Sequence, residues 1–373
     1  MQRQGGAPIR VHELSPVRLV AVRVTVTGNA QRGTGNVGLH PDAVLDQRLR
    51  GTRFVSLTPR SVLNSPAQTG MPFWSLNPYV GCEFGCSYCY ARYAHRYVVE
   101  RAHDAGKLST TEFRDLRGPH GWEAFEQRIF VKSELLRALE ADLRRFHRVS
   151  GPDDLLLIGT ATDPYQPAER RFRLTRSVLE RLTRCEGRSI GITTKSPLVT
   201  RDIDVLQRLQ AYNELHVQIS LISLDASLVR RLEVRSPVPG ARLRALRRLI
   251  DAGINAGLIV APVLPGITDG QAALDALLGA ARAAGARFIH SGPLRLYPGI
   301  RERFLPVLGT HFPALEGRYR AGFAPSGTAP EAYRRALSRR LARLRRKHGF
   351  AEPERAFNSP RAPWQFELGL PTS

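Results

Sequence analysis

The chain has 373 residues, of which 42% are hydrophobic. This length suits one large domain or two ordinary ones, and the hydrophobic content excludes a chain that is disordered throughout. Lysine and arginine total 55 against 33 aspartate and glutamate residues, so the formal net charge is +22. A surface this basic is typical of proteins with phosphate-bearing partners, and equally of a solvated exterior without a specific partner.

Two features bear on the location of the protein. The sequence contains no apolar run near the ~20 residues that a membrane-spanning helix needs. Its first residues carry arginines where a secretory signal peptide needs an apolar stretch. Together these features predict a cytoplasmic protein with no membrane partner.

We expect residues 1–70 to form an N-terminal arm outside the core. Residues 17–28 alternate apolar and polar side chains well enough for one half-buried strand. A loop-rich stretch follows, and the basic segment 48–65 then leads into a first core strand at 75–80.

Three of the four cysteines form a C-x3-C-x2-C loop directly after this strand: Cys82, Cys86 and Cys89. Close cysteines in a reducing compartment indicate a metal or cluster site rather than disulfides. Three thiolates hold three corners of an iron–sulfur cubane and leave one iron open, as in a catalytic centre. Structural zinc, bound by the three cysteines and His95, is the alternative. The fourth cysteine, Cys185, lies far along the chain and is interpreted as structural.

From residue 71 to about residue 310, short apolar runs alternate with amphipathic helical patterns. After the cysteine loop, the runs lie at 154–162, 188–196, 216–224, 257–264 and 287–296. The helical patterns between them lie at 134–146, 173–184 and 241–253. This alternation indicates a parallel sheet with helical crossovers, and six units predict an α/β fold, a partial (β/α)6 TIM-like barrel. A doubly wound open sheet competes, but no Gly-rich phosphate loop follows the first strand.

We expect residues 311–373 to form a basic helical C-terminal extension. Its main helix, at 332–349, carries one apolar stripe and fills its other faces with arginine. Trp364 and Phe366 in the tail are expected to pack on the core.

Arginines on two helices could neutralise the phosphates of DNA or RNA. They lie on the 332–349 helix and, in the 241–253 helix, at Arg242, Arg244, Arg247 and Arg248. Solvated helix faces explain the same residues equally well.

The string NPYVGCEFGCSYCYAR at 77–92 resembles the radical S-adenosylmethionine (radical SAM) enzymes, whose motif is C-x3-C-x-aromatic-C after a first β-strand. Together with the segments at 162–169, 193–196 and 261–269, it is similar to the branch that includes spore photoproduct lyase and its bacterial relatives. The resemblance covers about residues 70–310 and implies the radical SAM type of partial barrel.

The resemblance implies that Cys82, Cys86 and Cys89 ligate a [4Fe-4S] cluster whose open iron binds the methionine end of SAM. In that family the reduced cluster cleaves SAM, and the resulting 5′-deoxyadenosyl radical abstracts hydrogen from the substrate. Tyr88 resembles the aromatic residue that packs on the adenine. Lys195, one of only four lysines, resembles the lysine that pairs with the SAM carboxylate.

Other roles also follow from the resemblance. Thr160 and Thr162 would lie at the methionine end of SAM. Ser220 would hydrogen-bond the ribose, with Ser223 as its rival. The residues expected on the substrate side, where Tyr165 would act in catalysis, are Asp163, Tyr165, Gln166, Glu169 and Tyr297.

One departure from the branch concerns hydrogen donation. Spore photoproduct lyase uses a hydrogen-donating cysteine between the cluster loop and the second-strand region, and this chain has no cysteine between Cys89 and Cys185. Thymine-dimer reversal would therefore need a tyrosine relay, such as Tyr90, Tyr93 or Tyr165.

The sequence leaves three functions open. The first is a radical SAM enzyme acting on nucleic acid, in repair or modification, with a reductant of the flavodoxin or ferredoxin type. The second is the same chemistry on a peptide or small molecule. The third is a zinc-stabilised nucleic-acid-binding protein without catalysis.

Overall fold

The computed structural model describes residues 38–47, 51–118, 123–151, 154–323 and 327–351. The chain divides into two compact units, residues 1–35 and 36–373, and every described residue belongs to the second. The expected strand at 17–28 and the tail residues Trp364 and Phe366 lie outside the described residues.

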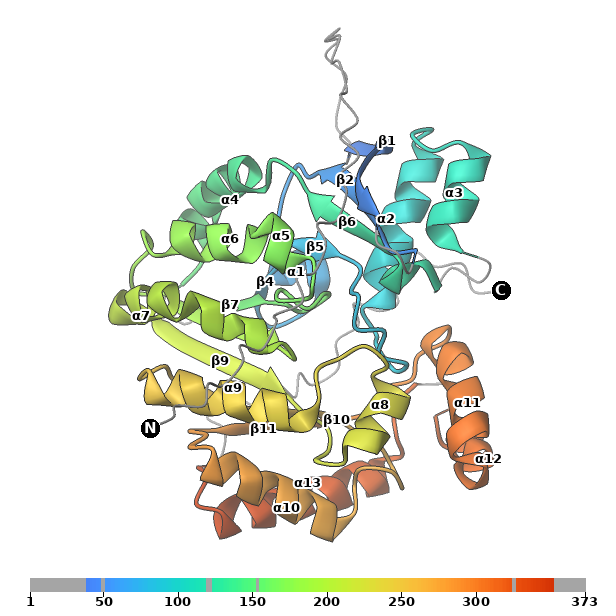
Figure 1. The fold of residues 1–373 in the computed structure, drawn as a ribbon, viewed down its shortest axis with the longest axis vertical. Helices are drawn as coiled ribbons and strands as arrows, with labels where there is room; N and C mark the ends of the chain where they lie inside the picture. The colour runs from blue at the N-terminus through green and yellow to red at the C-terminus, as the bar shows by residue number, and fades with distance from the viewer. Residues whose placement is uncertain (1–37, 48–50, 119–122, 152–153, 324–326, 352–373) are drawn as a thin grey trace, which may run out of the picture. The chain divides into compact units, whose positions relative to one another are not determined.

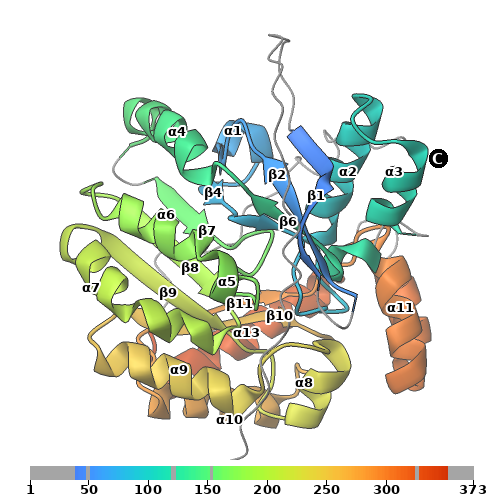
Figure 2. The ribbon, with the colours of Figure 1, turned by 45° about the horizontal axis from the view of Figure 1, so that its top comes forward.

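The main sheet has seven strands in the order β11-β10-β9-β8-β7-β4-β3. Neighbours from β4 to β11 are parallel, and only β3 joins antiparallel, on β4 (Figures 1 and 2). The strands are β3 (Leu63–Asn64), β4 (Trp74–Leu76), β7 (Leu155–Ile158), β8 (Ser189–Thr194), β9 (Glu214–Ser220), β10 (Ala256–Val263) and β11 (Ile289–Pro293). Six parallel strands with crossovers confirm the predicted partial (β/α)6 barrel.

Crossover helices cover the outer face of this sheet (Figure 2). Their apolar stripes and the strands' aliphatic side chains form one continuous core, which includes Leu139, Leu179, Leu206, Leu246 and Leu278. This packing buries the helices' apolar faces and turns the strand ends toward a common edge. The helices are α4 (Leu135–Val149), α6 (Leu174–Leu182), α7 (Ile203–Tyr212), α9 (Pro239–Asp251) and α10 (Gln271–Ala283).

A second sheet, which the sequence does not predict, has the order β1-β2-β6-β5. Val55, Leu57 and Phe130 pack against helices α2 and α3 on one face, while Phe54 and Ile129 are buried on the other. These elements are β1 (Gly38–Gln47), β2 (Arg53–Thr58), β5 (Tyr79–Val80), β6 (Arg128–Lys132), α2 (Arg92–Asp104) and α3 (Thr110–Arg117).

This arrangement corrects two expectations. Residues 1–70 are not wholly an arm outside the core, because β2 pairs with β6 and β3 pairs with β4. The expected strand at 75–80 is two strands in different sheets, since β4 pairs with β7 and β5 pairs with β6. The partners are remote along the chain, so local periodicity does not reveal them.

Short helical segments complete the barrel loops. They are α1 (Pro66–Thr69), the 3-10 turn at Glu123–Glu126, α5 (Glu169–Phe172), the 3-10 turn at Pro197–Asp202 and α8 (Ala226–Leu232). Among the helices that the structure describes, none has both the length and the apolar character to cross a bilayer.

The C-terminal part adds α11 (Ile300–His311), α12 (Pro313–Gly322) and α13 (Glu331–Lys347). Helix α13 is the predicted basic helix, and its Leu337, Leu341 and Leu344 join the main core. The expected domain boundary at residue 310 falls inside α11, and it stays a prediction.

Candidate active site

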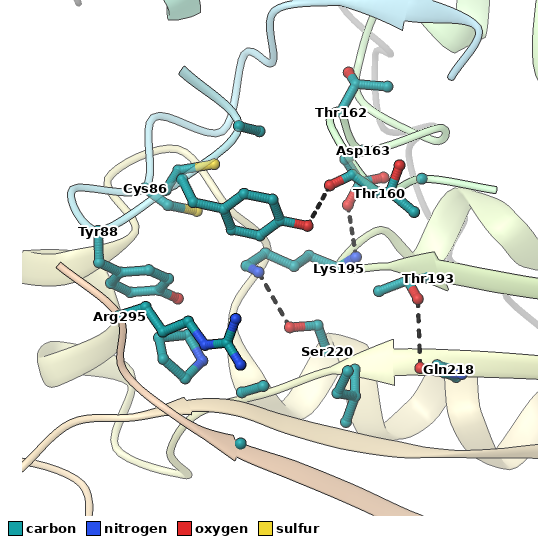
Figure 3. A pocket seen from close by; sticks show the side chains of 18 of the residues that line it. Cys86, Tyr88, Thr160, Thr162, Asp163, Thr193, Lys195, Gln218, Ser220 and Arg295 are labelled. Atoms are coloured by element: carbon teal, nitrogen blue, oxygen red, sulfur yellow. Dashed lines mark hydrogen bonds between the residues drawn. The ribbon is translucent and has the colours of Figure 1, made fainter. Parts of the chain in front are cut away.

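A cavity of about 370 Å³ opens at the carboxyl ends of the main-sheet strands. Its wall combines the cysteine loop with residues at the ends of β7, β8, β9 and β11 (Figure 3). Most of the residues that the sequence predicts for the site line this cavity, namely Cys82, Cys86, Cys89, Tyr88, Thr160, Thr162, Lys195 and Ser220. Residues more than 130 positions apart in the chain thus meet in one space.

The cysteine loop is anchored at its start by a close backbone approach. Gly81 has φ +89°, and a Cβ there would lie 2.7 Å from the carbonyl oxygen of Phe125, so glycine is required. The amide of Cys82 donates to the same carbonyl at 3.0 Å. Thr162 Oγ1 donates to the Gly81 carbonyl at 2.6 Å, and Gln166 Nε2 donates to it at 3.1 Å.

The far side of the loop is paired with the segment after α8. Cys86 forms an isolated antiparallel bridge with Glu233. The amide of Ser87 donates to the Leu232 carbonyl at 2.9 Å, and the amide of Arg235 donates to the Phe84 carbonyl at 3.0 Å. The loop backbone is therefore fixed before any cofactor binds.

The donor set fits an iron–sulfur cluster. Burial raises the pKa of all three thiols, whereas Lys195 lowers it at Cys86, and Arg92 and Lys195 lower it at Cys89. Metal binding releases thiol protons, so these cations favour the thiolate form that a cluster needs. The loop carries three sulfurs, which suits a cubane with one open iron.

His95 does not line the cavity that the three cysteines line. Its ring is buried, stacks on Phe130 at 5.0 Å and lies 2.9 Å from the Arg128 carbonyl oxygen through Nε2. Burial lowers the pKa of His95 to about 4. These contacts hold the ring of His95, a residue of α2, against β6 of the second sheet and do not support His95 as a zinc ligand beside the cysteine loop.

Lys195 follows β8, and its side chain extends into the cavity (Figure 3). Its backbone amide donates to Asp163 Oδ2 at 2.7 Å, which fixes the turn. The ammonium donates to Ser220 Oγ at 3.1 Å and lies 3.7 Å from Glu233 Oε1. Burial opposes the charge, but Glu233 and Cys86 together raise the pKa of Lys195 above its usual range.

Glu233 is a buried residue of this site that the sequence reasoning missed. Its carboxylate accepts hydrogen bonds from Tyr88 Oη, Arg242 Nη2 and Ser236 Oγ, besides its ion pair with Lys195. Burial alone would raise the pKa of Glu233, but Lys195 and Arg242 lower it to about 2. One carboxylate thus connects the cluster loop to the lysine of the cavity.

The structure corrects the interpretation of Arg242 as a phosphate-binding surface residue. Its side chain is fully buried and donates to the carbonyl oxygens of Ser220 and Pro237, besides Glu233. A buried guanidinium whose donors bond to carbonyl oxygens and a carboxylate of the protein has a structural role. The signal that could have revealed this is the acidic residue nine positions earlier, in a chain short of acids.

The basic C-terminal helix is also largely committed to internal contacts. Arg340 donates to the Asp269 carbonyl, Arg343 to Gln271 and Arg345 to Ser291. These bonds hold α13 against neighbouring elements of the barrel. The helix therefore supplies fewer free cations than its composition indicates.

Several residues expected on the substrate side lie elsewhere. Tyr165 is fully buried in the main core and does not line the cavity, so its expected catalytic position is wrong. Gln166 and Glu169 are buried braces: Gln166 holds Gly81, and Glu169 accepts from Tyr79 Oη at 2.5 Å. Asp163 does line the cavity, but its carboxylate accepts from Thr194 Oγ1 at 2.6 Å and from two amides.

The structure also separates rival residues. Ser220 lines the cavity, whereas Ser223 lies outside it and accepts from the Asp225 amide at 3.1 Å. Of the tyrosines considered as relays, Tyr90 lines the cavity, whereas Tyr93 does not. Tyr297 lines it as expected.

Cys185 lies in the main core away from the cavity. It is 4% exposed, and its sulfur lies 3.5 Å from His147 Nε2. Burial raises the pKa of this thiol. Its position agrees with the structural role predicted for it.

Known proteins similar to this chain include relatives and solved structures. An uncharacterised protein of Mycobacterium tuberculosis (strain ATCC 25618 / H37Rv) is 32% identical over 88% of this chain and 91% of its own length. An uncharacterised protein of Methanocaldococcus jannaschii is 26% identical over 52% of this chain and 61% of its own length. A structure of spore photoproduct lyase complexed with dinucleoside spore photoproduct has a similar fold, with a TM-score of 0.56, 14% identity and 79% of each chain covered.

A family model described as the radical SAM superfamily matches residues 76–277, more than half of the chain. The match begins at β4 and spans the cysteine loop, Lys195, Ser220 and Glu233. Members of this superfamily use a [4Fe-4S] cluster and SAM. The chain belongs to the radical SAM superfamily and is an enzyme with these two cofactors.

Proposed function

We propose that Cys82, Cys86 and Cys89 hold the [4Fe-4S] cluster and that the cavity beside them binds SAM together with a nucleic-acid substrate. The observation that carries the proposal is the convergence of the three cysteines, Lys195 and Ser220 on one cavity. When bound and reduced, the cluster supplies reductive cleavage of SAM to a 5′-deoxyadenosyl radical, which abstracts a hydrogen atom from the substrate.

Lys195 is placed to bind the SAM carboxylate. Its ammonium is charged, reaches the cavity and is held by Ser220 Oγ and Glu233 rather than by a bidentate partner. A carboxylate that enters the cavity can therefore join this network at small cost. Ser220 would then be near the ribose, as the family resemblance implies.

Tyr88 can offer only its ring to the adenine. Its hydroxyl is bound to Glu233, so the phenol is held in one orientation. Burial and the Glu233 carboxylate raise the pKa of Tyr88, which keeps the hydroxyl protonated. We assign Tyr88 to an apolar contact with the adenine.

The two threonines divide between cofactor and framework. Thr160 lines the cavity, and its Oγ1 accepts from Asn77 at 2.9 Å, which leaves its proton for a ligand. Thr162 donates its proton to the Gly81 carbonyl and accepts from Gln166. We therefore assign Thr160 to the methionine end of SAM and Thr162 to support of the cluster loop.

The reaction outcome differs from thymine-dimer reversal through a cysteine. Among the described residues, the cavity is lined by no cysteine beyond the three of the loop. Tyr90 lines the cavity, and its hydroxyl donates to the Thr160 carbonyl at 2.5 Å. We assign Tyr90 as the residue best placed to relay a hydrogen atom, in repair or modification of a nucleotide.

An anaerobic assay of the reconstituted wild-type protein tests this function. We expect about four irons per chain, and 5′-deoxyadenosine when SAM and a low-potential reductant of the flavodoxin or ferredoxin type are supplied. Oligonucleotides with deuterated sugars or bases would transfer deuterium into that product. Stoichiometric zinc without iron, or no deoxyadenosine from a fully loaded cluster, would contradict the proposal.

A further inference from the structure

The segment after β11 lines one side of the cavity. Leu294, Arg295 and Tyr297 line it, whereas Leu296 does not. Leu294 and Leu296 are buried in an apolar cluster, while Arg295 is exposed. We call Arg295 and Tyr297 the outer rim of the cavity.

The backbone of the outer rim is fixed on both sides. The Leu294 amide donates to the Val263 carbonyl at 3.0 Å, and the Leu296 amide donates to the Gly327 carbonyl at 2.6 Å. Arg295 also forms an isolated bridge with Thr328. The rim side chains therefore project from a rigid support, as residues that select a ligand require.

Arg295 is an exposed cation that the protein itself does not neutralise. Its side chain has neither a hydrogen bond nor an ion pair with any residue in the described part of the chain. Figure 3 shows the side chain extending into the pocket. Asp163 is the one acidic residue among the described residues of the lining, and its carboxylate is already hydrogen-bonded by three donors.

The charges of the cavity therefore call for a second anion. The proposed function assigns the SAM carboxylate to Lys195, so one cation, Arg295, is left at the rim. A guanidinium binds phosphate by paired hydrogen bonds, and a neighbouring tyrosine ring can stack on a base. An anion next to an aromatic ring is the pattern of a nucleotide.

We propose that Arg295 binds a backbone phosphodiester of the nucleic-acid substrate and that Tyr297 stacks on an adjacent base. This inference rests on the proposed function and names the contact that selects the substrate. It places substrate recognition at the outer rim rather than on the arginines of α13, which are engaged in internal contacts.

The test compares oligonucleotide binding by the cluster-loaded full chain and by its variants. Short single-stranded oligonucleotides carry either a normal phosphodiester or a neutral methylphosphonate at the central linkage. We expect the wild-type protein to bind the neutral linkage about tenfold more weakly, and Arg295→Gln to bind both equally weakly. The slope of log affinity against log salt concentration should be shallower for Arg295→Gln than for wild type, by about the contribution of one phosphate contact.

Arg287→Gln is the matched control. Arg287 is exposed and precedes the same strand, so it lies at the opposite end of β11 from Arg295. We expect this variant to distinguish the two linkages as the wild-type protein does. Arg295→Lys keeps the charge without the paired donors and should recover part of the discrimination.

Three results would overturn the inference. The first is that Arg295→Gln binds the neutral linkage more weakly than the phosphodiester by the same factor as wild type. That result would place the phosphate contact elsewhere. The second is a weaker affinity of Arg295→Gln for SAM with unchanged linkage discrimination, which assigns the guanidinium to the cosubstrate. The third is preferential binding of an acidic peptide over oligonucleotides. Failure of the proposed function is detected separately: the iron-loaded wild-type protein would then produce no 5′-deoxyadenosine from SAM and reductant, whatever the binding results.

Discussion

The cluster loop and the outer rim line the same cavity, yet they are built differently. Backbone hydrogen bonds fix both segments, but the loop's side chains are buried and Glu233 ties Tyr88 to Lys195, whereas Arg295 is exposed and projects without a protein partner among the described residues. A radical centre needs fixed ligands and the exclusion of stray hydrogen donors. A rim that selects substrate needs side chains whose hydrogen-bonding groups remain available. The difference indicates that the cysteine loop serves the chemistry and that the outer rim serves substrate selection.

The largest expected effect tests the cluster side of this comparison. Replacing Cys82, Cys86 or Cys89 by alanine should abolish SAM cleavage, because each variant removes one corner ligand of the cluster. Iron content and 5′-deoxyadenosine yield measure the loss. Cys185→Ala is the control and should retain both, since Cys185 lies in the core away from the cavity. Loss of cleavage in a folded, iron-loaded Cys185→Ala would contradict the assignment.

Glu233→Gln should strongly destabilise the protein, because Glu233 is buried and pairs with both Lys195 and Arg242. The substitution leaves the buried guanidinium of Arg242 without its anion, and breaking such a pair costs about 3–5 kcal/mol of unfolding free energy. Denaturant unfolding measures the change. Glu186→Gln, at an exposed residue, is the control, and we expect less than about 0.5 kcal/mol there. An equal effect in both variants would show that the ion pairs of Glu233 do not contribute to stability as we expect.

Lys195→Ala should weaken SAM binding by about 10- to 100-fold, since it removes a charged hydrogen-bond donor. Equilibrium binding to the iron-loaded protein measures the affinity. Ser223→Ala, outside the cavity, should leave that affinity unchanged, whereas Ser220→Ala should reduce it. Unchanged SAM affinity in Lys195→Ala would assign the carboxylate to another cation of the cavity.

The pH dependence of SAM binding sharpens the same test. Lys195 binds a carboxylate only when it is protonated, and Glu233 holds the pKa of Lys195 above its usual range. In wild type, the part of the affinity loss that comes from deprotonation of Lys195 should therefore begin only above about pH 10. In Glu233→Gln, the largest interaction that offsets burial is lost, so the pKa of Lys195 falls and the affinity should decline at a lower pH than in wild type. Identical pH profiles of SAM binding in wild type and Glu233→Gln would show that Glu233 does not control the pKa of Lys195.

The smallest expected effect compares two glycines of the cluster loop. Gly81→Ala places a Cβ 2.7 Å from the Phe125 carbonyl oxygen at φ +89°, and we expect a loss of about 1–3 kcal/mol. Gly85→Ala also has a positive φ, but nothing lies within 4 Å of its Cβ, so the loss should be about 1 kcal/mol. Thermal unfolding of the two variants measures the difference, and an inverted order would show that the loop can shift.

Much of the barrel was predictable because its signals are local. The apolar run at 188–196 contains β8, the run at 257–264 overlaps β10 in all but its first residue, and the leucine-rich patterns between the runs are helices. The three cysteines are also a local signal, because a cluster loop needs its ligands close together in the sequence. The second sheet was missed because β2 pairs with β6, and these strands are separated by more than 60 residues.

Short-range spacing was enough to predict the family and the alternation of strands and helices, and it also underlies the proposal that the three clustered cysteines ligate the cluster. Which polar residues reach the cavity became evident only in the folded chain. The fold buries Tyr165 in the core, pairs Arg242 with Glu233 and leaves Arg295 at the rim. Burial and charge pairing depend on contacts between strand ends and loops that are far apart in the chain. Local sequence patterns therefore do not predict them.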